Sequence, residues 1–282
     1  MAKMEKYLAR IDRLKLMDDD FFSEALDGKI EAVEFILRVV LGRDDLRVIE
    51  TRAQVEYKSA TKRSIRLDIK AVDRMNKHFD IDIQRADSGA DAKRARFHGS
   101  MIDRELLEKN QDFKELPESF IIFITENDKY ECGVPVYHIE RTIEEREHAL
   151  FEDGLHILYV NGEYRDADTP IGRLMHDFHC TKSEDMYSKV LAEEVKYLKE
   201  TEGGRGHMCR ILEEMCEEVE KETAERVERE TAERVKKETA ERVAKETAKS
   251  LLALGKLSHE DISKGTGLPL EVVEELAMQK TA

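Results

Sequence analysis

Long apolar runs and organised cysteines are the two features that this 282-residue sequence most clearly lacks. Its four cysteines form no C-x-x-C pair and no regular spacing, which argues against a disulfide framework and against a zinc site. No apolar run approaches the roughly 20 residues of a membrane span. Residues 1–20 are charged throughout and lack the apolar core of a signal peptide. We therefore expect a soluble cytoplasmic protein that has no membrane partner.

The chain also lacks an overall positive charge, since its formal net charge is -15. This excess of acid argues against a generic nucleic-acid coat protein, because neutralising phosphates requires clustered Lys and Arg. The charge is unevenly distributed, however, and residues 58–100 hold eleven Lys and Arg against six Asp. A basic zone in an acidic protein is typical of a site that handles phosphate, although basic side chains also protect the edges of sheets.

Two alternating segments, residues 63–72 and 78–86, lie within this basic zone. Apolar and polar residues alternate in both, which predicts two half-buried strands joined by a polar turn. If the chain reverses symmetrically about Met75, Asp68 lies directly across from Asp82. The sequence therefore predicts two carboxylates that face each other.

Such a cross-strand pair of like charges destabilises a sheet unless something compensates for it. A divalent cation would compensate, because hard ions such as Mg²⁺ bind through one or two carboxylates, waters and substrate phosphates. A solvated acidic face, on a hairpin splayed by its twist, explains the spacing equally well. Spacing alone leaves both interpretations open.

The hairpin residues carry a resemblance to a known family. Asp68, then Asp82-Ile83-Gln84 leading into a basic segment, resembles the catalytic hairpin of the PD-(D/E)xK nuclease superfamily. Within that superfamily the sequence is similar to the recombination-promoting nuclease, or transposase, family. The resemblance runs from residue 17 to about 200 and includes these segments: LDIKAVD, FDIDIQRAD, AKRARFHGSMID, LPESFIIFITEND, GVPVYHIER and HILYVNGEY.

This resemblance implies an α/β fold with a restriction-endonuclease-like core, a mixed sheet flanked by helices. It implies a metal-dependent DNA endonuclease that uses Mg²⁺ or Mn²⁺, with Asp68, Asp82 and the Ile83 carbonyl as metal ligands. Gln84 stands where the superfamily usually has Lys; an amide can orient a water but adds no charge to the transition state. A catalytically degenerate relative, binding DNA or protein through the basic zone and a helical arm, is the alternative from a different class.

The resemblance also calls for an acid on the first core helix, within residues 18–41. Glu34 falls on the apolar stripe of the segment KIEAVEFILRVVLG, where a carboxylate is costly unless it is paired or bound to metal. Glu31 falls outside this stripe, so we expect Glu34 to complete the catalytic acidic cluster. A Glu that escapes at the edge of the stripe is the alternative.

We expect residues 91–109 to form a helix that follows the hairpin and carries cations for phosphate contact. Arg94 shares a face with Phe97 and should be held by packing near the site, where a guanidinium suits bidentate phosphate contact. Lys93 and Arg96 should be more exposed, and a solvated charge on the helix explains these two well. We nevertheless expect all three cations to contact DNA phosphate.

The remaining segments predict a second domain. Residues 1–200 should form the nuclease-like domain, 201–206 a linker, 207–254 a charged helix and 255–282 a helix-turn-helix-like tail. Residues 171–199 should form one helix that closes the first domain. From Glu222 an eight-residue repeat rotates its apolar stripe by about 80° per repeat, which disfavours a long coiled coil. We expect a solvated spacer helix, with homo-oligomerisation through the C-terminal helices as the alternative.

Overall fold

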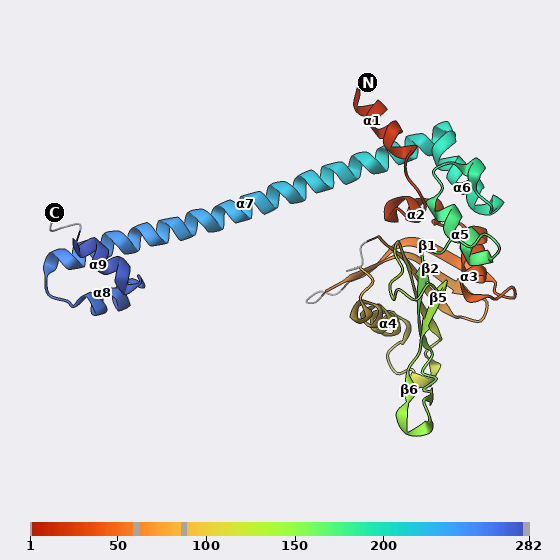
Figure 1. The fold of residues 1–282 in the computed structure, drawn as a ribbon, viewed down its shortest axis with the longest axis horizontal. Coiled ribbons are helices and arrows are strands. Elements are labelled where there is room, and N and C mark those ends of the chain that lie inside the picture. Colours follow the sequence, from red (N-terminus) through yellow and green to blue (C-terminus); the bar gives the residue numbers. More distant parts are fainter. Residues whose placement is uncertain (1, 59–62, 86–88, 279–282) are drawn as a thin grey trace. The chain divides into compact units, whose positions relative to one another are not determined.

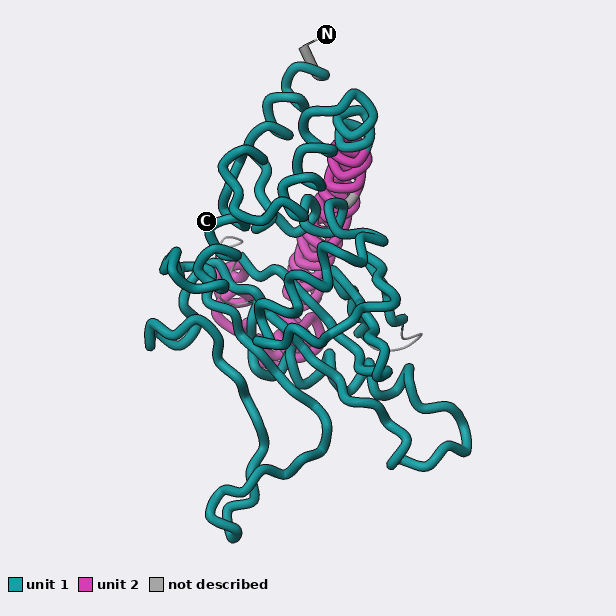
Figure 2. The backbone as a smooth tube through the Cα atoms, turned by 90° about the vertical axis from the view of Figure 1, so that its right-hand side faces the viewer, with its two compact units in different colours: residues 1–210 teal, residues 211–282 magenta. Residues whose placement is uncertain are grey.

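A computed structural model describes residues 2–58, 63–85 and 89–278 of the chain. The chain divides into two compact units, Met1–Arg210 and Ile211–Ala282 (Figure 2). The first unit extends beyond the predicted boundary at residue 200, because Met208 and Cys209 are buried and His207 Nε2 lies 2.6 Å from Glu24 Oε2.

A six-stranded mixed sheet forms the centre of the first unit, with the order β1-β2-β3-β4-β8-β5. The first three strands, β1 (Val48–Tyr57), β2 (Ile65–Asp73) and β3 (His78–Gln84), form an antiparallel meander, in which β2 and β3 are the two predicted strands. Two parallel strands follow, β4 (Ser119–Thr125) and β8 (Leu155–Asn161), and β5 (Val136–Ile139) pairs antiparallel at the edge. The predicted α/β architecture is confirmed.

Helices cover both faces of this sheet (Figure 1). The helix α4 (Ala92–Leu106) packs on one face through an apolar cluster that includes Met101, Ile102, Ile121 and Phe123. The opposite face carries α2 (Asp19–Leu26) and α3 (Ile30–Leu41), against which α5 (Pro170–His179) and α6 (Lys189–Glu200) pack. The other short elements of this unit are α1 (Ala2–Ile11), η1 (Phe113–Glu115), β6 (Thr142–Ile143), η2 (Glu144–Arg146), β7 (Ala149–Leu150) and η3 (Ser183–Asp185).

The presence of helices on both faces of the sheet corrects one expectation about the hairpin. The strands were predicted to be half-buried, but every residue of β3 is buried because both faces of this central strand are packed. A sheet whose helices lie on both faces has no solvated side for its central strands. The polar residues of β3 are therefore interior groups that need partners.

The expected helix over residues 171–199 is broken in two. After α5 ends, the buried carboxylate of Asp177 accepts hydrogen bonds from the backbone N–H groups of Tyr187 (2.7 Å) and Ser188 (2.8 Å). The Ser188 hydroxyl then caps α6 by accepting a bond from Leu191 N. The hydrogen bonds to Asp177 stabilise the break between the two helices. The apolar periodicity of the segment does not predict this break.

The second unit contains most of α7 (Glu202–Leu254) and two short helices, α8 (His259–Thr266) and α9 (Leu270–Met278). A small core of Ala248, Ile262, Leu268 and Val273 joins the tail helices to the end of α7. The repeat valines Val227, Val235 and Val243 are all at least half exposed, as expected of a solvated helix. Among the described residues no helix combines the length and apolarity needed to cross a membrane.

The predicted linker at residues 201–206 is also wrong as a local structure, because Glu202–Gly206 form the first turns of α7. One of their glycines, Gly204, allows close packing. A Cβ placed on Gly204 would come within 2.0 Å of the Tyr197 carbonyl oxygen and 2.7 Å of Leu198 Cα, both backbone atoms of α6.

A matched pair of substitutions, one at Gly204 and one at Gly206, tests this packing. Gly204→Ala should lower the free energy of unfolding by more than 1 kcal/mol, because the two backbones cannot separate without disturbing both helices. Gly206→Ala should be neutral or stabilising by up to about 1 kcal/mol, since nothing lies within 4 Å of its Cβ position and Ala favours helix. Urea unfolding of both variants measures the difference, and equal stabilities would show that the segment is a flexible linker.

Candidate active site

The antiparallel ladder between β2 and β3 has the predicted register. Ile69 pairs with Ile81 and Lys70 with Asp80, so residue numbers of partners add to 150, as a reversal about Met75 requires. At the next position, hydrogen bonds from the backbone to carboxylates take the place of the backbone–backbone bonds between the strands. Asp68 N donates to Asp82 Oδ1 (3.0 Å), and Ile83 N donates to Asp68 Oδ2 (2.9 Å). The two carboxylates therefore hold the ends of the strands together across a splay.

Both carboxylates are removed from bulk water. Asp68 is 5% exposed and Asp82 is fully buried. Asp82 Oδ2 lies 3.5 Å from Arg94 Nη2 and 3.6 Å from His98 Nδ1, yet it accepts no hydrogen bond within the described part of the chain. Burying a carboxylate oxygen without a hydrogen bond is costly.

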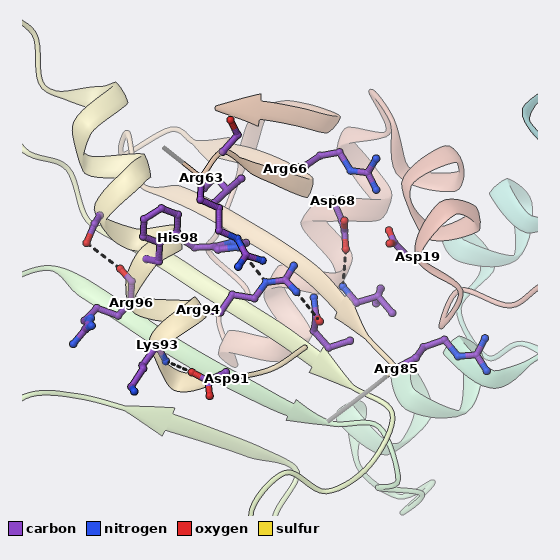
Figure 3. A pocket seen from close by; sticks show the side chains of 16 residues that line it. Asp19, Arg63, Arg66, Asp68, Arg85, Asp91, Lys93, Arg94, Arg96 and His98 are labelled. Carbon is purple, nitrogen blue, oxygen red and sulfur yellow. Dashed lines mark hydrogen bonds between the residues drawn. The ribbon is translucent and has the colours of Figure 1, made fainter. Parts of the chain in front are cut away.

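A third carboxylate, that of Asp19, joins this pair from the first turn of α2. It lines the same pocket as Asp68, and in Figure 3 the two carboxylates lie next to each other. Asp19 Oδ1 is buried and, like Asp82 Oδ2, has no hydrogen-bond partner among the described residues. The helix acid beside the hairpin is thus Asp19.

Glu34 corrects the expectation from the sequence. Its Oε2 accepts a hydrogen bond from Val48 N (2.9 Å), and its Oε1 forms ion pairs with Arg38 and Arg47. It does not line the pocket. The buried face of α3 is centred on Val33, Ile36, Leu37 and Val40, so Glu34 stands at its margin and anchors the start of β1, while Glu31 is exposed.

A buried pair that the sequence reasoning missed, Asp80 and His98, lies behind the carboxylates. Asp80 is fully buried, and its Oδ2 lies 2.8 Å from His98 Nδ1. No role was predicted for Asp80 from the sequence. The alternation HFDIDIQ nevertheless carried the signal, because residues two apart on a strand share a face, so Asp80 had to follow Asp82 into the interior.

Arg94 connects this buried pair to the pocket. Its Nε lies 3.3 Å from His98 Nε2, and its Nη1 donates to Gln84 Oε1 and to the Gly89 carbonyl, each at 3.3 Å. The guanidinium also lies over the ring of Phe123. As predicted, Arg94 is held by packing while Lys93 and Arg96 are exposed.

These groups surround one open pocket of about 1110 Å³ between α2, the β2–β3 splay and α4 (Figure 3). The pocket is rich in cations and includes Ile83 and Gln84 in its wall. Its charged lining residues are Asp19, Arg63, Arg66, Asp68, Arg85, Asp91, Lys93, Arg94, Arg96 and His98. Six cations of the basic zone therefore line the pocket, whereas Lys58, Lys70, Arg74 and Lys77 do not. Lys62 and Asp87 of that zone lie outside the described residues.

The electrostatics of the site reflect its burial. Burial raises the pKa of Asp68 far above its ordinary value, and the charges of Asp82 and Asp19 raise it further. The pKa of Asp82 is raised by burial and then by Asp80, and burial raises the pKa of Asp80 to about 8. Burial lowers the pKa of His98. A cation near these acids would favour their ionised forms.

The donor set fits a hard divalent ion. Asp19, Asp68 and Asp82 offer carboxylate oxygens, and two of those oxygens are buried without hydrogen bonds, which leaves them free as ligands. The ligand atoms of Asp80, Asp82 and His98 also lie within 4.8 Å of one another. That second group is buried and already joined by the hydrogen bond between His98 and Asp80, whereas Asp19 and Asp68 line the open pocket and are more accessible to an ion.

Comparison with known proteins gives one match. A family model described as PD-(D/E)XK nuclease family transposase matches residues 33–251. The matched range contains Asp68, Asp82 and Gln84 but begins after Asp19, and it continues past residue 200 into α7. No curated protein and no solved structure matches the chain.

The buried acids predict how stability depends on pH without metal. Because folding raises the pKa of Asp68 from its ordinary value near 3.8, the folded protein retains a proton that the unfolded chain loses above about pH 4. This contribution to stability is therefore present at low pH and lost as pH rises toward the folded pKa. Asp68→Asn removes the charge while its side-chain oxygen can still accept from Ile83 N.

In EDTA at pH 7 we expect Asp68→Asn to unfold at a temperature at least equal to that of wild type and roughly 2–4 °C higher for each 1 kcal/mol gained. The difference should shrink as pH falls toward 4. Thermal melts at several pH values measure it. A variant that is clearly less stable than wild type at pH 7 would contradict the raised pKa of Asp68.

Proposed function

Since the chain belongs to the PD-(D/E)XK nuclease family of transposases, we propose that it is a metal-dependent endonuclease that hydrolyses phosphodiester bonds in DNA, of the recombination-promoting type. One observation carries the proposal. The carboxylates of Asp19 and Asp68 line a pocket walled by Arg and Lys, and the buried carboxylate of Asp82 is bonded through Oδ1 to the backbone N–H of Asp68. Anionic ligands alone suit a cation, and surrounding cations suit an anionic substrate.

Asp19, Asp68 and Asp82 would hold Mg²⁺ or Mn²⁺, with the Ile83 carbonyl as a further oxygen ligand. When bound, such an ion supplies a Lewis acid for the phosphate and lowers the pKa of a bound water. The chain itself fixes the ligands, because Asp68 and Asp82 are each tied to the backbone of the opposite strand. This rigidity preserves the geometry that catalysis needs.

Gln84 and Arg94 have separate roles at the pocket wall, the first toward water and the second toward phosphate. The Gln84 carbonyl oxygen accepts from Arg94, so its amide NH₂ is oriented away from the guanidinium and can position a water. The Arg94 side chain is 38% exposed and can offer donors to a phosphate oxygen. His98, fixed by Asp80, holds the Nε edge of Arg94 and so acts as a positioning residue.

The exposed cations extend this surface beyond the reacting phosphate. Arg63, Arg66, Lys93 and Arg96 line the pocket and are exposed, so they are placed to contact the phosphates of a bound strand. Arg85 is less available, because it forms ion pairs with Asp18 and Glu126. Binding through such contacts is independent of base sequence and weakens with salt.

The C-terminal segments have a separate role in this proposal. Exposed side chains cover the repeat of α7, and the second tail helix presents Glu271, Glu274 and Glu275, which are poorly suited to a DNA groove. We assign α7 and the tail to assembly or targeting, with association between copies of the chain as one form that this could take.

Paired substitutions of the two candidate acids test the site. Asp19→Asn should reduce DNA cleavage in Mg²⁺ by roughly 10²- to 10³-fold, as is typical when one group that stabilises charge in the transition state is lost. Glu34→Gln should leave cleavage within a few-fold of wild type, since Glu34 binds Arg38, Arg47 and the backbone of β1. Nicking of plasmid DNA measures both.

Asp68→Asn provides the reference for complete loss of the site, and circular dichroism verifies that each variant is folded. If Glu34→Gln loses cleavage and Asp19→Asn retains it, the acid has been misassigned. If wild type cleaves no DNA with Mg²⁺ or Mn²⁺ yet binds it, the degenerate binding relative is the better description.

Truncation tests the division of labour. A fragment of residues 1–221 ends before the repeat and keeps Met208 and Cys209, which are buried. It should bind DNA with the salt dependence of the full chain, because log K falls with log salt in proportion to the phosphates neutralised, and the pocket cations remain. Fluorescence anisotropy at several salt concentrations measures this. A folded fragment whose salt slope is much smaller would place DNA contacts in the C-terminal segments.

A further inference from the structure

A second cluster of ligand-type side chains lies at the β5 edge of the sheet, away from the pocket. It consists of His138 in β5, Glu140 just after it and His156 in β8. His156 is level with Phe120 at the beginning of the parallel strands, whereas Gln84 is level with Thr125 and Asn161 at their other end. The cluster and the pocket are thus separated by most of the strand length.

Strand register brings the three side chains together. His138 pairs with Leu158 and Ile139 with Ile157, so continuing the register puts Glu140 across from His156. Residues two apart on a strand share a face, which places His138, Glu140 and His156 on the same side of the sheet.

One carboxylate oxygen joins both rings. Glu140 Oε1 lies 2.7 Å from His138 Nε2 and 2.5 Å from His156 Nδ1, and the ring centroids are 5.5 Å apart. The three ligand atoms lie within 4.8 Å of one another. Half-burial keeps the group accessible, since the side chains of His138, Glu140 and His156 are 50%, 21% and 22% exposed.

Neighbouring groups fix the His156 ring in an orientation that suits a metal ligand. The ring stacks on Phe120 at 4.4 Å with an interplanar angle of 17°. Its other nitrogen, Nε2, lies 3.7 Å from Glu118 Oε2, and Lys77 Nζ holds that carboxylate at 2.5 Å. A metal-bound histidine commonly directs its second N–H toward a carboxylate, and Glu118 stands in that place.

We propose that His138, Glu140 and His156 form a binding site for a transition-metal ion of the Zn²⁺ class. Two imidazole nitrogens and one carboxylate oxygen, with a water in the fourth position, are a ligand set that Zn²⁺ accepts and that Mg²⁺ does not favour. In the metal-bound form each imidazole would bind the ion through the nitrogen that faces Glu140 and carry its one proton on the other nitrogen, which is Nδ1 in His138 and, in His156, Nε2 facing Glu118. Neutral imidazoles and an ionised carboxylate are the ligand forms that bind.

Such an ion would clamp the edge of the sheet. The strand β5 has no pairing partner on its outer side within the described sheet, and its residues are only partly buried. The segment that follows it carries the short strands β6 and β7, and β6 lies in a part that projects away from the sheet (Figure 1). Linking β5 to β8 through metal would stabilise the folded state in proportion to metal binding.

The test is titration of the full-length metal-free protein with Zn²⁺, followed by calorimetry, and with Co²⁺, followed by visible absorption. His138→Ala and Glu140→Gln should each lose one equivalent of bound metal or weaken it by more than tenfold. His148→Asn is the matched control, because His148 is an exposed histidine outside the cluster. Asp68→Asn should retain this equivalent, which separates it from the ion of the pocket.

A second variant probes the surroundings of the site without removing a ligand. Glu118→Gln should weaken Zn²⁺ binding by about 10- to 100-fold, the usual effect of altering a partner of a metal-bound histidine. Zn²⁺ should also raise the melting temperature of wild type and of Asp68→Asn, but not of His138→Ala. Equal stoichiometry and affinity in wild type and folded His138→Ala would overturn the proposal, whatever the outcome for DNA cleavage.

Discussion

The close approach of Asp68 and Asp82 is the constraint on which the first unit depends. Two carboxylates that are largely or fully buried repel each other and lose hydration, and either effect alone opposes folding. Their backbone bonds to Asp68 N and Ile83 N offset part of this cost. Arg94 and His98 lie close to Asp82 Oδ2 and offset a further part, and in the proposed function a cation in the pocket compensates for the remainder.

The architecture of the sheet supplies these groups from different parts of the chain. The strand β3 ends at the pocket, where Ile83 and Gln84 line the wall, and ligand sites at the carboxyl ends of strands are general in open α/β sheets. Both α2 and α4 begin at the pocket, so Asp19 and the pair Lys93 and Arg94 stand in first helical turns. A helix N-terminus favours an anion, which suits the buried carboxylate of Asp19 at α2 and a substrate phosphate near α4.

The sequence predicts local periodicity well and long-range partners poorly. The hairpin register and the burial of Arg94 relative to Lys93 and Arg96 followed from alternation and helical spacing. Asp19 did not, because nothing local distinguishes it from Asp18 and Asp20; only the packing of α2 brings it to Asp68. Glu34 was misassigned because a helical wheel shows only the direction in which each side chain leaves the helix. It does not show that Glu34, at the margin of the buried face of α3, pairs with Arg38 and Arg47.

Charge distribution explains how the pocket can do without the Lys that usually follows the second acid of the superfamily. A Lys at position 84 would face the guanidinium of Arg94, since Gln84 Oε1 now accepts from Arg94 Nη1, and two cations at that distance would repel. In the proposed function the positive charge comes instead from α4. That charge is the guanidinium of Arg94, whose Nε contacts His98 and which lies over the ring of Phe123. His98 is in turn bonded to Asp80. The amide at position 84 and the buried Asp80–His98 pair are then two parts of one arrangement, in which the strand provides an acceptor and the helix provides the cation.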